Sequence, residues 1–90
     1  MKGAKKFYLK CEVSEGIFSN EIIVKFKDVK GNNISGCWPS NCTKNGLLEV
    51  RVAETGKDKS LILGPFLDCG GYGFFPGKGF YVSNDLLSSE

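Results

Sequence analysis

The sequence predicts a small all-β protein, a barrel of five to six short, mostly antiparallel strands with a C-terminal helical turn. Several segments of four to seven residues alternate apolar with polar side chains, which is the period of a half-buried strand. Turn residues recur between these segments, and no stretch has the period of an amphipathic helix. We expect residues 1–90 to form one domain, of a size that folds alone around a thin core.

The first two predicted strands are residues 7–13, which alternate cleanly, and residues 21–27. Their expected core-facing side chains are Phe7, Leu9, Cys11, Val13, Ile22, Val24 and Phe26. The segment 28–33 has Gly and Asn where a hairpin turn needs them. A third strand, 34–38, is therefore expected to pair with the second and to stop at Pro39.

The second half of the chain predicts a hairpin and a closing strand. An Asn-Gly turn at 45–46 precedes the strand 47–52, and a turn at 54–58 precedes the strand 59–63. The last strand is 79–82, followed by a helical turn over 83–87 that Ser83 or Asn84 can cap. A barrel would remove unpaired sheet edges, which is why we prefer it to a small sandwich.

Two segments resemble SH3-like small barrels. Gly79-Phe-Tyr-Val-Ser-Asn-Asp-Leu-Leu87 looks like the closing strand and helical turn of such barrels. Gly16-Ile-Phe-Ser-Asn-Glu21, followed by a strand and an Asp-x-x-Gly turn, resembles short uncharacterised bacterial proteins with a predicted SH3-like fold. The Ala-Leu-Tyr-Asp-Tyr type of segment that lines the SH3 peptide groove does not occur here. The resemblance therefore implies a fold, and it does not imply recognition of proline-rich peptides.

Charge and composition exclude several classes of function. The net charge of +2 is too mild for electrostatics alone to indicate a dedicated nucleic-acid binder. The chain contains no histidine, which rules out Ser–His and Cys–His hydrolase chemistry. Because no catalytic acid–base set can be named, we expect a protein that is not an enzyme and that needs no cofactor.

The sequence also predicts a cytoplasmic location. No apolar run approaches the ~20 residues of a membrane helix, and the basic N-terminal residues are not followed by the apolar region of a signal peptide. The four cysteines are then expected to be mostly thiols. Cys37 and Cys42 are four residues apart, at the loose end of zinc-ligand spacing, and free thiols, a disulfide and metal ligation all stay open for them. We expect no bound metal.

The candidate binding residues are aromatic groups, most of them in the irregular segments around Pro39 and over 72–75. We expect Trp38, Tyr72, Phe74, Phe75 and Tyr81 to contact a partner, with Lys78 as a charged neighbour. The Gly-rich segment 70–79 is not a phosphate cradle, because a strand and not a helix follows it. Whether its aromatics face the core or a partner stays open.

These residues predict a binding or accessory module, of unknown oligomeric state, that recognises another protein. The alternative is a small barrel that binds single-stranded nucleic acid, with the same aromatics stacking on bases beside Lys10, Lys25, Lys27 and Lys78. No membrane partner is expected.

Overall fold

The structure is a computed structural model that describes residues 5–16, 18–66, 72–75, 77 and 79–89. The strands in this part of the chain are β1 (Lys5–Lys10), β2 (Glu12–Glu15), β3 (Glu21–Lys27), β4 (Asn33–Pro39), β5 (Thr43–Lys44), β6 (Leu47–Thr55), β7 (Lys59–Leu63), β8 (Gly73–Phe75), β9 (Gly79–Ser83) and β10 (Leu87–Ser88). Two 3-10 turns accompany them, η1 (Ser40–Cys42) and η2 (Asn84–Leu86). Within these residues, no helix is long and apolar enough to cross a membrane.

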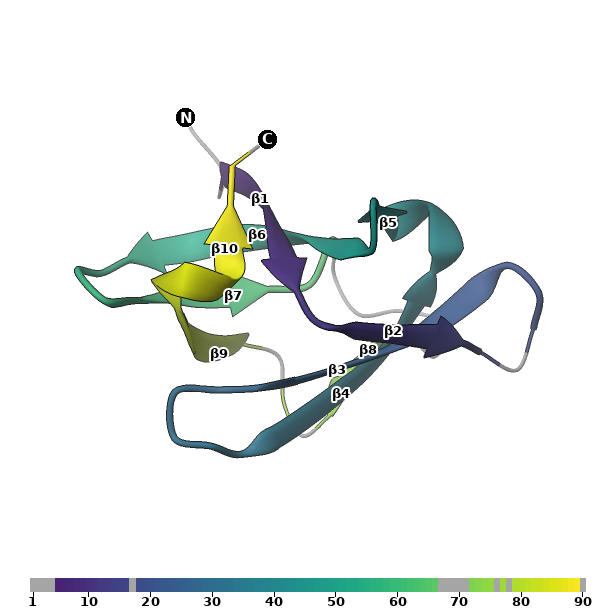
Figure 1. Ribbon diagram of the computed structural model, residues 1–90, viewed down its shortest axis with the longest axis horizontal. Coiled ribbons are helices and arrows are strands. Elements are labelled where there is room, and N and C mark those ends of the chain that lie inside the picture. The colour runs from purple at the N-terminus through teal and green to yellow at the C-terminus, as the bar shows by residue number, and fades with distance from the viewer. Residues whose placement is uncertain (1–4, 17, 67–71, 76, 78, 90) are drawn as a thin grey trace.

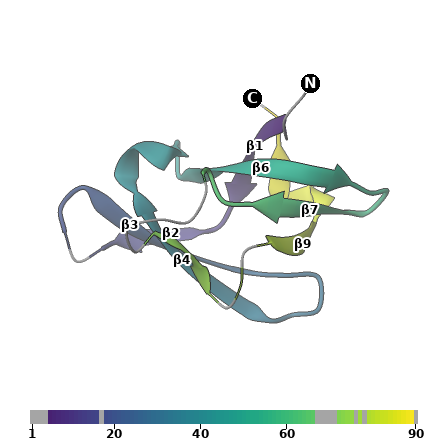
Figure 2. The ribbon, with the colours of Figure 1, turned by 180° about the vertical axis from the view of Figure 1, so that it is seen from behind.

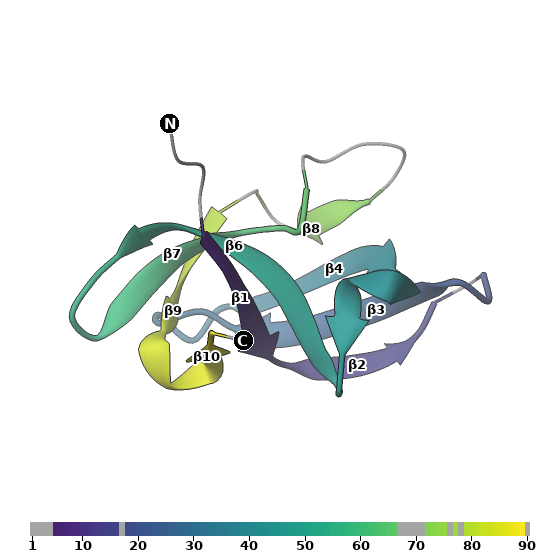
Figure 3. The same cartoon turned by 90° about the horizontal axis from the view of Figure 1, so that it is seen from above.

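The strands form two antiparallel sheets, so the prediction of a closed barrel is wrong. The six-stranded sheet has the order β10-β1-β6-β7-β9 with β5 beside β6, and the four-stranded sheet has the order β2-β3-β4-β8. The two sheets are seen from the front, from behind and from above in Figures 1, 2 and 3.

The sheets separate where the first predicted strand bends at Cys11. Its first half is β1, which pairs with β6 and β10, and its second half is β2, which pairs with β3. A strand that changes sheets at a corner is typical of two sheets that pack across each other. In the part of the chain that the structure describes, β1 pairs with β6 and β10 but not with the end of β3.

The six-stranded sheet curls so that its two edge strands are joined by a single 3-10 turn. β9 leads through η2 into β10, which lies beside β1 (Figure 1). The Ser83 side chain caps this turn by accepting a hydrogen bond from the Asp85 N–H at 3.2 Å. The predicted helical turn is thus a 3-10 turn, shorter than the segment 83–87.

The β3–β4 hairpin docks on the free side of β9. At its tip the Val29 N–H donates to the Tyr81 carbonyl at 2.9 Å, so the hairpin ties the four-stranded sheet to the six-stranded one. The Asp28 carboxylate fixes the turn by accepting hydrogen bonds from the Lys30 and Asn32 N–H groups, both at 2.9 Å. The Val29–Tyr81 hydrogen bond therefore joins the two sheets at the tip of the hairpin.

The buried core confirms most of the predicted strands. Strands β3, β4, β6, β7 and β9 lie where the alternation places them, and β3 pairs with β4 as expected. The buried apolar residues are Leu9, Ile22, Val24, Phe26, Ile34, Trp38, Cys42, Leu48, Val50, Val52, Ile62, Phe74, Phe80 and Val82. Val13 was expected in the core but is 38% exposed, because β2 is an edge strand. The short strands β5, β8 and β10 were not predicted.

Candidate binding site

Two of the aromatic residues predicted to contact a partner lie in the core. Trp38 is 0% exposed and Phe74 is 4% exposed. Their rings meet edge to face with centroids 5.2 Å apart, and Phe66 packs against the other side of Trp38, also at 5.2 Å. Neither Trp38 nor Phe74 presents a surface to a partner.

Glycines make the space that the Trp38 indole fills. A methyl group at Gly64 would lie 2.3 Å from two carbons of the indole, and one at Gly36 would lie 2.9 Å from its Nε1 atom. Both positions therefore exclude any larger residue while the indole stays in place. The Nε1 group has no hydrogen-bond partner, in the part of the chain that the structure describes.

Tyr72 and Phe75 flank the buried Phe74 and differ from it in exposure. Tyr72 is half-buried and donates its hydroxyl to the Glu21 carboxylate at 2.9 Å, and this hydrogen bond, together with burial, raises the pKa of the tyrosine. Phe75 is 60% exposed on β8. Its partner in the neighbouring strand is Ser35 of β4. Of the aromatics in the Gly-rich segment, only Phe75 presents most of its ring to solvent.

Tyr81 belongs to the other sheet. It is 38% exposed on β9, and its hydroxyl donates to the Glu54 carboxylate, which raises the pKa of the tyrosine. The Lys59 ammonium lies 5.2 Å from the centre of its ring, within cation–π range. Lys78, the sixth predicted site residue, lies outside the described residues. The structure therefore does not bring the predicted set together at one surface.

The cysteines lie in different surroundings. Cys37 is half-buried on β4, while Cys42 belongs to the buried core, and both are free thiols, as is Cys11. Burial raises the pKa of all three thiols, that of Cys11 to about 11. Over the described ranges, no group of three metal-ligating side chains occurs, and Cys69 falls outside these ranges.

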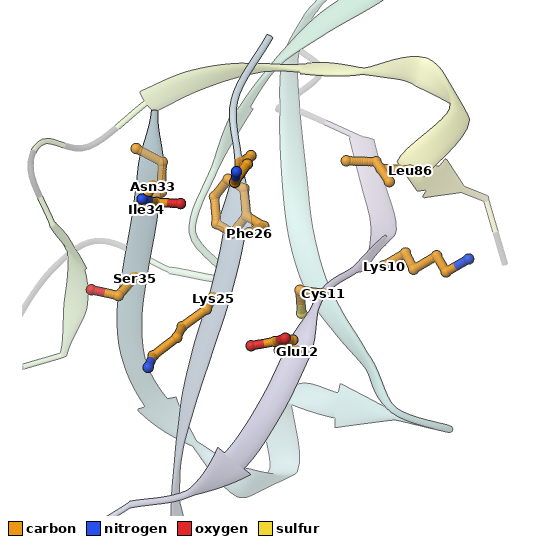
Figure 4. A pocket seen from close by; sticks show the side chains of 10 residues that line it. Lys10, Cys11, Glu12, Lys25, Phe26, Asn33, Ile34, Ser35 and Leu86 are labelled. Carbon is orange, nitrogen blue, oxygen red and sulfur yellow. The ribbon is translucent and has the colours of Figure 1, made fainter. Parts of the chain in front are cut away.

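A cleft of about 850 Å³ opens beside the bend at Cys11, and we call it the lysine cleft. Figure 4 shows the side chains that line it. They are Lys10, Cys11, Glu12, Lys25, Phe26, Lys27, Asn33, Ile34, Ser35 and Leu86. The cleft therefore lies between the bend that joins β1 to β2, the paired ends of β3 and β4, and the 3-10 turn η2.

The lysine cleft has an apolar floor and a positively charged rim. Its buried and half-buried apolar groups are Phe26, Ile34, Leu86 and the Cys11 thiol. Its exposed charged groups are Lys10, Lys25, Lys27 and Glu12. Among the described residues, these three lysines have no ion-pair partner. An apolar floor beside these ammonium groups suits a ligand that carries both an apolar group and an anionic group.

Three residues that line the cleft also belong to a row across the outer face of the four-stranded sheet. Glu12 pairs with Lys25, Lys25 with Ser35, and Ser35 with Phe75, so these four residues form one row across the strands. Residues directly opposite in adjacent strands point to the same side of the sheet. The exposed Phe75 thus shares a face with Lys25, and both residues belong to the set predicted for the nucleic-acid alternative.

Sequence patterns point to only part of this site. Lys10, Lys25 and Lys27 are recognisable as outward residues of predicted strands, but the cleft depends on the bend at Cys11, for which the alternation of residues 7–13 gives no signal. A comparison of the chain with models of protein families, with curated proteins and with solved structures finds no match.

Proposed function

We propose that the protein is a non-catalytic binding module that holds an extended segment of a partner protein in the lysine cleft. The observation that carries the proposal is the combination of an apolar floor, formed by Phe26, Ile34 and Leu86, with three lysines at its rim that pair with no described acidic side chain. The matching segment has an aliphatic side chain for the floor and carboxylates for the lysines.

The two parts of the cleft contribute differently to binding. Burying one aliphatic side chain of the partner contributes about 1.5–3 kcal/mol. Each exposed lysine–carboxylate pair adds only about 0.2–1 kcal/mol. The floor therefore supplies most of the affinity, while the lysines select an acidic segment over a basic one. Phe75 extends the contact along the row that it shares with Lys25.

Binding of single-stranded nucleic acid is the second candidate. The row across the four-stranded sheet supports it, because Phe75 can stack on a base while Lys25 approaches a phosphate. Glu12 stands in the same row and would repel a phosphate as it would a carboxylate, so it does not separate the two candidates. The buried Trp38 and Phe74 cannot stack on bases, which leaves Phe75, among the described residues, without the neighbouring aromatics that a stacking surface needs. We therefore favour the protein partner.

A pair of peptides tests the proposal. We expect acetyl-Glu-Leu-Glu-Val-Glu-amide to bind, with shifts in the amide NMR signals of Phe26, Ile34 and Leu86, whereas the matched peptide with lysines in place of the glutamates does not bind. Lys25→Ala should weaken binding about threefold, which is the loss of one exposed ion pair. Lys57→Ala, an exposed lysine that does not line the cleft, is the control and should change nothing.

Oligo(dT) separates the two candidates. If it binds at the row through Phe75, with an affinity that falls steeply as the salt concentration rises, and the acidic peptide does not bind, the nucleic-acid function replaces the protein-binding one. A mainly apolar peptide contact should depend on salt much less.

We further propose that the fold is an open variant of the SH3-like barrel and that the protein works in a reducing compartment such as the cytoplasm. The passage from β9 through the 3-10 turn η2 into β10, which returns to β1, supports the first idea. The free thiols of Cys11, Cys37 and Cys42 support the second.

A further inference from the structure

We propose that the partner segment binds by strand addition, pairing with the backbone of Lys27 in the position that β1 leaves open. This inference rests on the proposed function, since it specifies how a segment occupies the lysine cleft. Strand addition uses main-chain hydrogen bonds for affinity and alternate side chains for specificity.

The open position follows from the strand pairing. β3 pairs with β4 along its whole length, from Glu21 opposite Pro39 to Lys27 opposite Asn33. On its other side β3 pairs with β2 only as far as Lys25, which lies opposite Glu12. Beyond that pair the chain bends at Cys11 and β1 joins the other sheet. The end of β3 therefore borders the cleft with one side unpaired, as far as the described strands extend.

The direction of the Lys27 backbone groups follows from the hydrogen bonds around it. The Asp28 N–H donates to the Asn32 carbonyl at 3.1 Å across the hairpin, so Asp28 directs its N–H toward the β4 side. At the other end of the strand, the Glu21 carbonyl accepts from the Gly16 N–H at 2.9 Å, on the β2 side. Successive residues of a strand direct their backbone groups to opposite sides. Lys27 therefore presents its N–H and C=O to the cleft.

The surroundings of this position specify the occupant. An added strand would place alternate side chains over Phe26 on the inner side and beside Lys25 and Lys27 on the outer side, as β3 does with its own residues. The inner side chains must be apolar, and the outer ones must be acidic to meet the unpaired lysines. The occupant is therefore an extended segment of a partner protein that alternates aliphatic and acidic residues.

Two substitutions of Lys27 separate the contribution of its backbone N–H to binding from the contribution of its charge. Lys27→Ala removes the ammonium and keeps the N–H, whereas Lys27→Pro removes both. Because the Lys27 N–H points away from β4, proline there breaks no ladder hydrogen bond, and such positions tolerate proline. We expect Lys27→Ala to weaken binding of acetyl-Glu-Leu-Glu-Val-Glu-amide about threefold and Lys27→Pro to weaken it about tenfold further.

A second measurement leaves the protein unchanged, in case Lys27→Pro does not fold. The same peptide is N-methylated either at its first, third and fifth residues or at its second and fourth. Only one of these two sets directs its N–H groups toward β3, so one methylated peptide should lose binding while the other keeps it.

The outcomes separate this inference from the proposed function. If the peptide binds but neither the proline substitution nor either methylation pattern weakens it beyond the effect of Lys27→Ala, strand addition is wrong and the cleft still binds the segment. If no peptide binds, both ideas are overturned. If sedimentation shows that the protein is a dimer that the peptide disperses, the occupant is a second copy of this chain and not a different protein.

Discussion

At the Trp38 end of β4 the core is closed by aromatic rings and glycines, whereas at the Ile34 end it opens into the lysine cleft. Both residues are buried and both point inward from the same strand. The difference lies in what covers them. Phe66 and Phe74 pack against Trp38, while the bend at Cys11 takes β1 away from the strands beside Ile34.

This difference separates a structural region from the proposed binding region. The closed end leaves no room for a ligand, since even a methyl group at Gly64 would overlap the Trp38 ring. The open end has exposed lysines that have no ion-pair partner among the described residues. Substitutions at the closed end should therefore change stability, and substitutions at the open end should change binding.

The largest expected effect is the contrast between two adjacent phenylalanines. Phe74→Ser should lower the free energy of unfolding by about 4 kcal/mol, because Phe74 packs edge to face against Phe26, Trp38 and Phe80. Phe75→Ser should change it by less than about 1 kcal/mol, since most of this ring is exposed. Urea unfolding followed by circular dichroism measures both. Equal losses would show that β8 does not divide the core from the surface.

The next effect tests how tightly the closed end is packed. Gly64→Ala should destabilise the protein by about 3 kcal/mol, because the new methyl overlaps the indole. Gly79→Ala is the matched control, since its methyl would contact only the ends of leucine side chains within 3.4 Å, and these can move. In a Trp38→Phe background, which removes the overlapping ring carbons, the cost of Gly64→Ala should fall. Thermal unfolding of the four variants and the wild type gives the coupling energy between Trp38 and Gly64. If the effects of the two substitutions simply add, the proposed packing is contradicted.

The smallest effect concerns the thiol at the open end. Burial raises the pKa of Cys11 from 9.0 to about 11, because it disfavours the thiolate. The folded state then binds the proton more tightly than the unfolded state, so this contribution to stability is complete below about pH 9 and is lost as the pH rises through about 11. We expect the stability difference between the wild type and Cys11→Ala to shrink over this range. A difference that does not change with pH would place Cys11 in a more hydrated site.

Local sequence patterns were sufficient to predict a pair of strands when the two strands are close in sequence. The β3–β4 hairpin was predicted from alternation and from the Gly and Asn residues of the turn, and its register places each inward residue in the core. The turn before β6 was also predicted, and the positive φ angles of Asn45 (55°) and Gly46 (80°) confirm it.

The site could not be predicted in the same way. Residues 7–13 keep the same alternation through the bend at Cys11, so the step from one sheet to the other leaves no trace in the pattern. β8 was missed because Gly73–Phe75 lacks alternation and lies in a Gly-rich segment. The exposure of each aromatic depends on which face of β8 it occupies, and this in turn depends on the pairing of β8 with β4.

The sequence by itself determined that the protein is built from short antiparallel strands, because side-chain alternation and turn chemistry are local properties. Only the tertiary structure decided how the strands divide between two sheets, since this depends on contacts between segments far apart in the chain. The same contacts bury Trp38 and Phe74, expose Phe75, and gather Lys10, Lys25 and Lys27 around one cleft. Chemically similar aromatics thus differ in exposure because burial is set by packing and not by residue type.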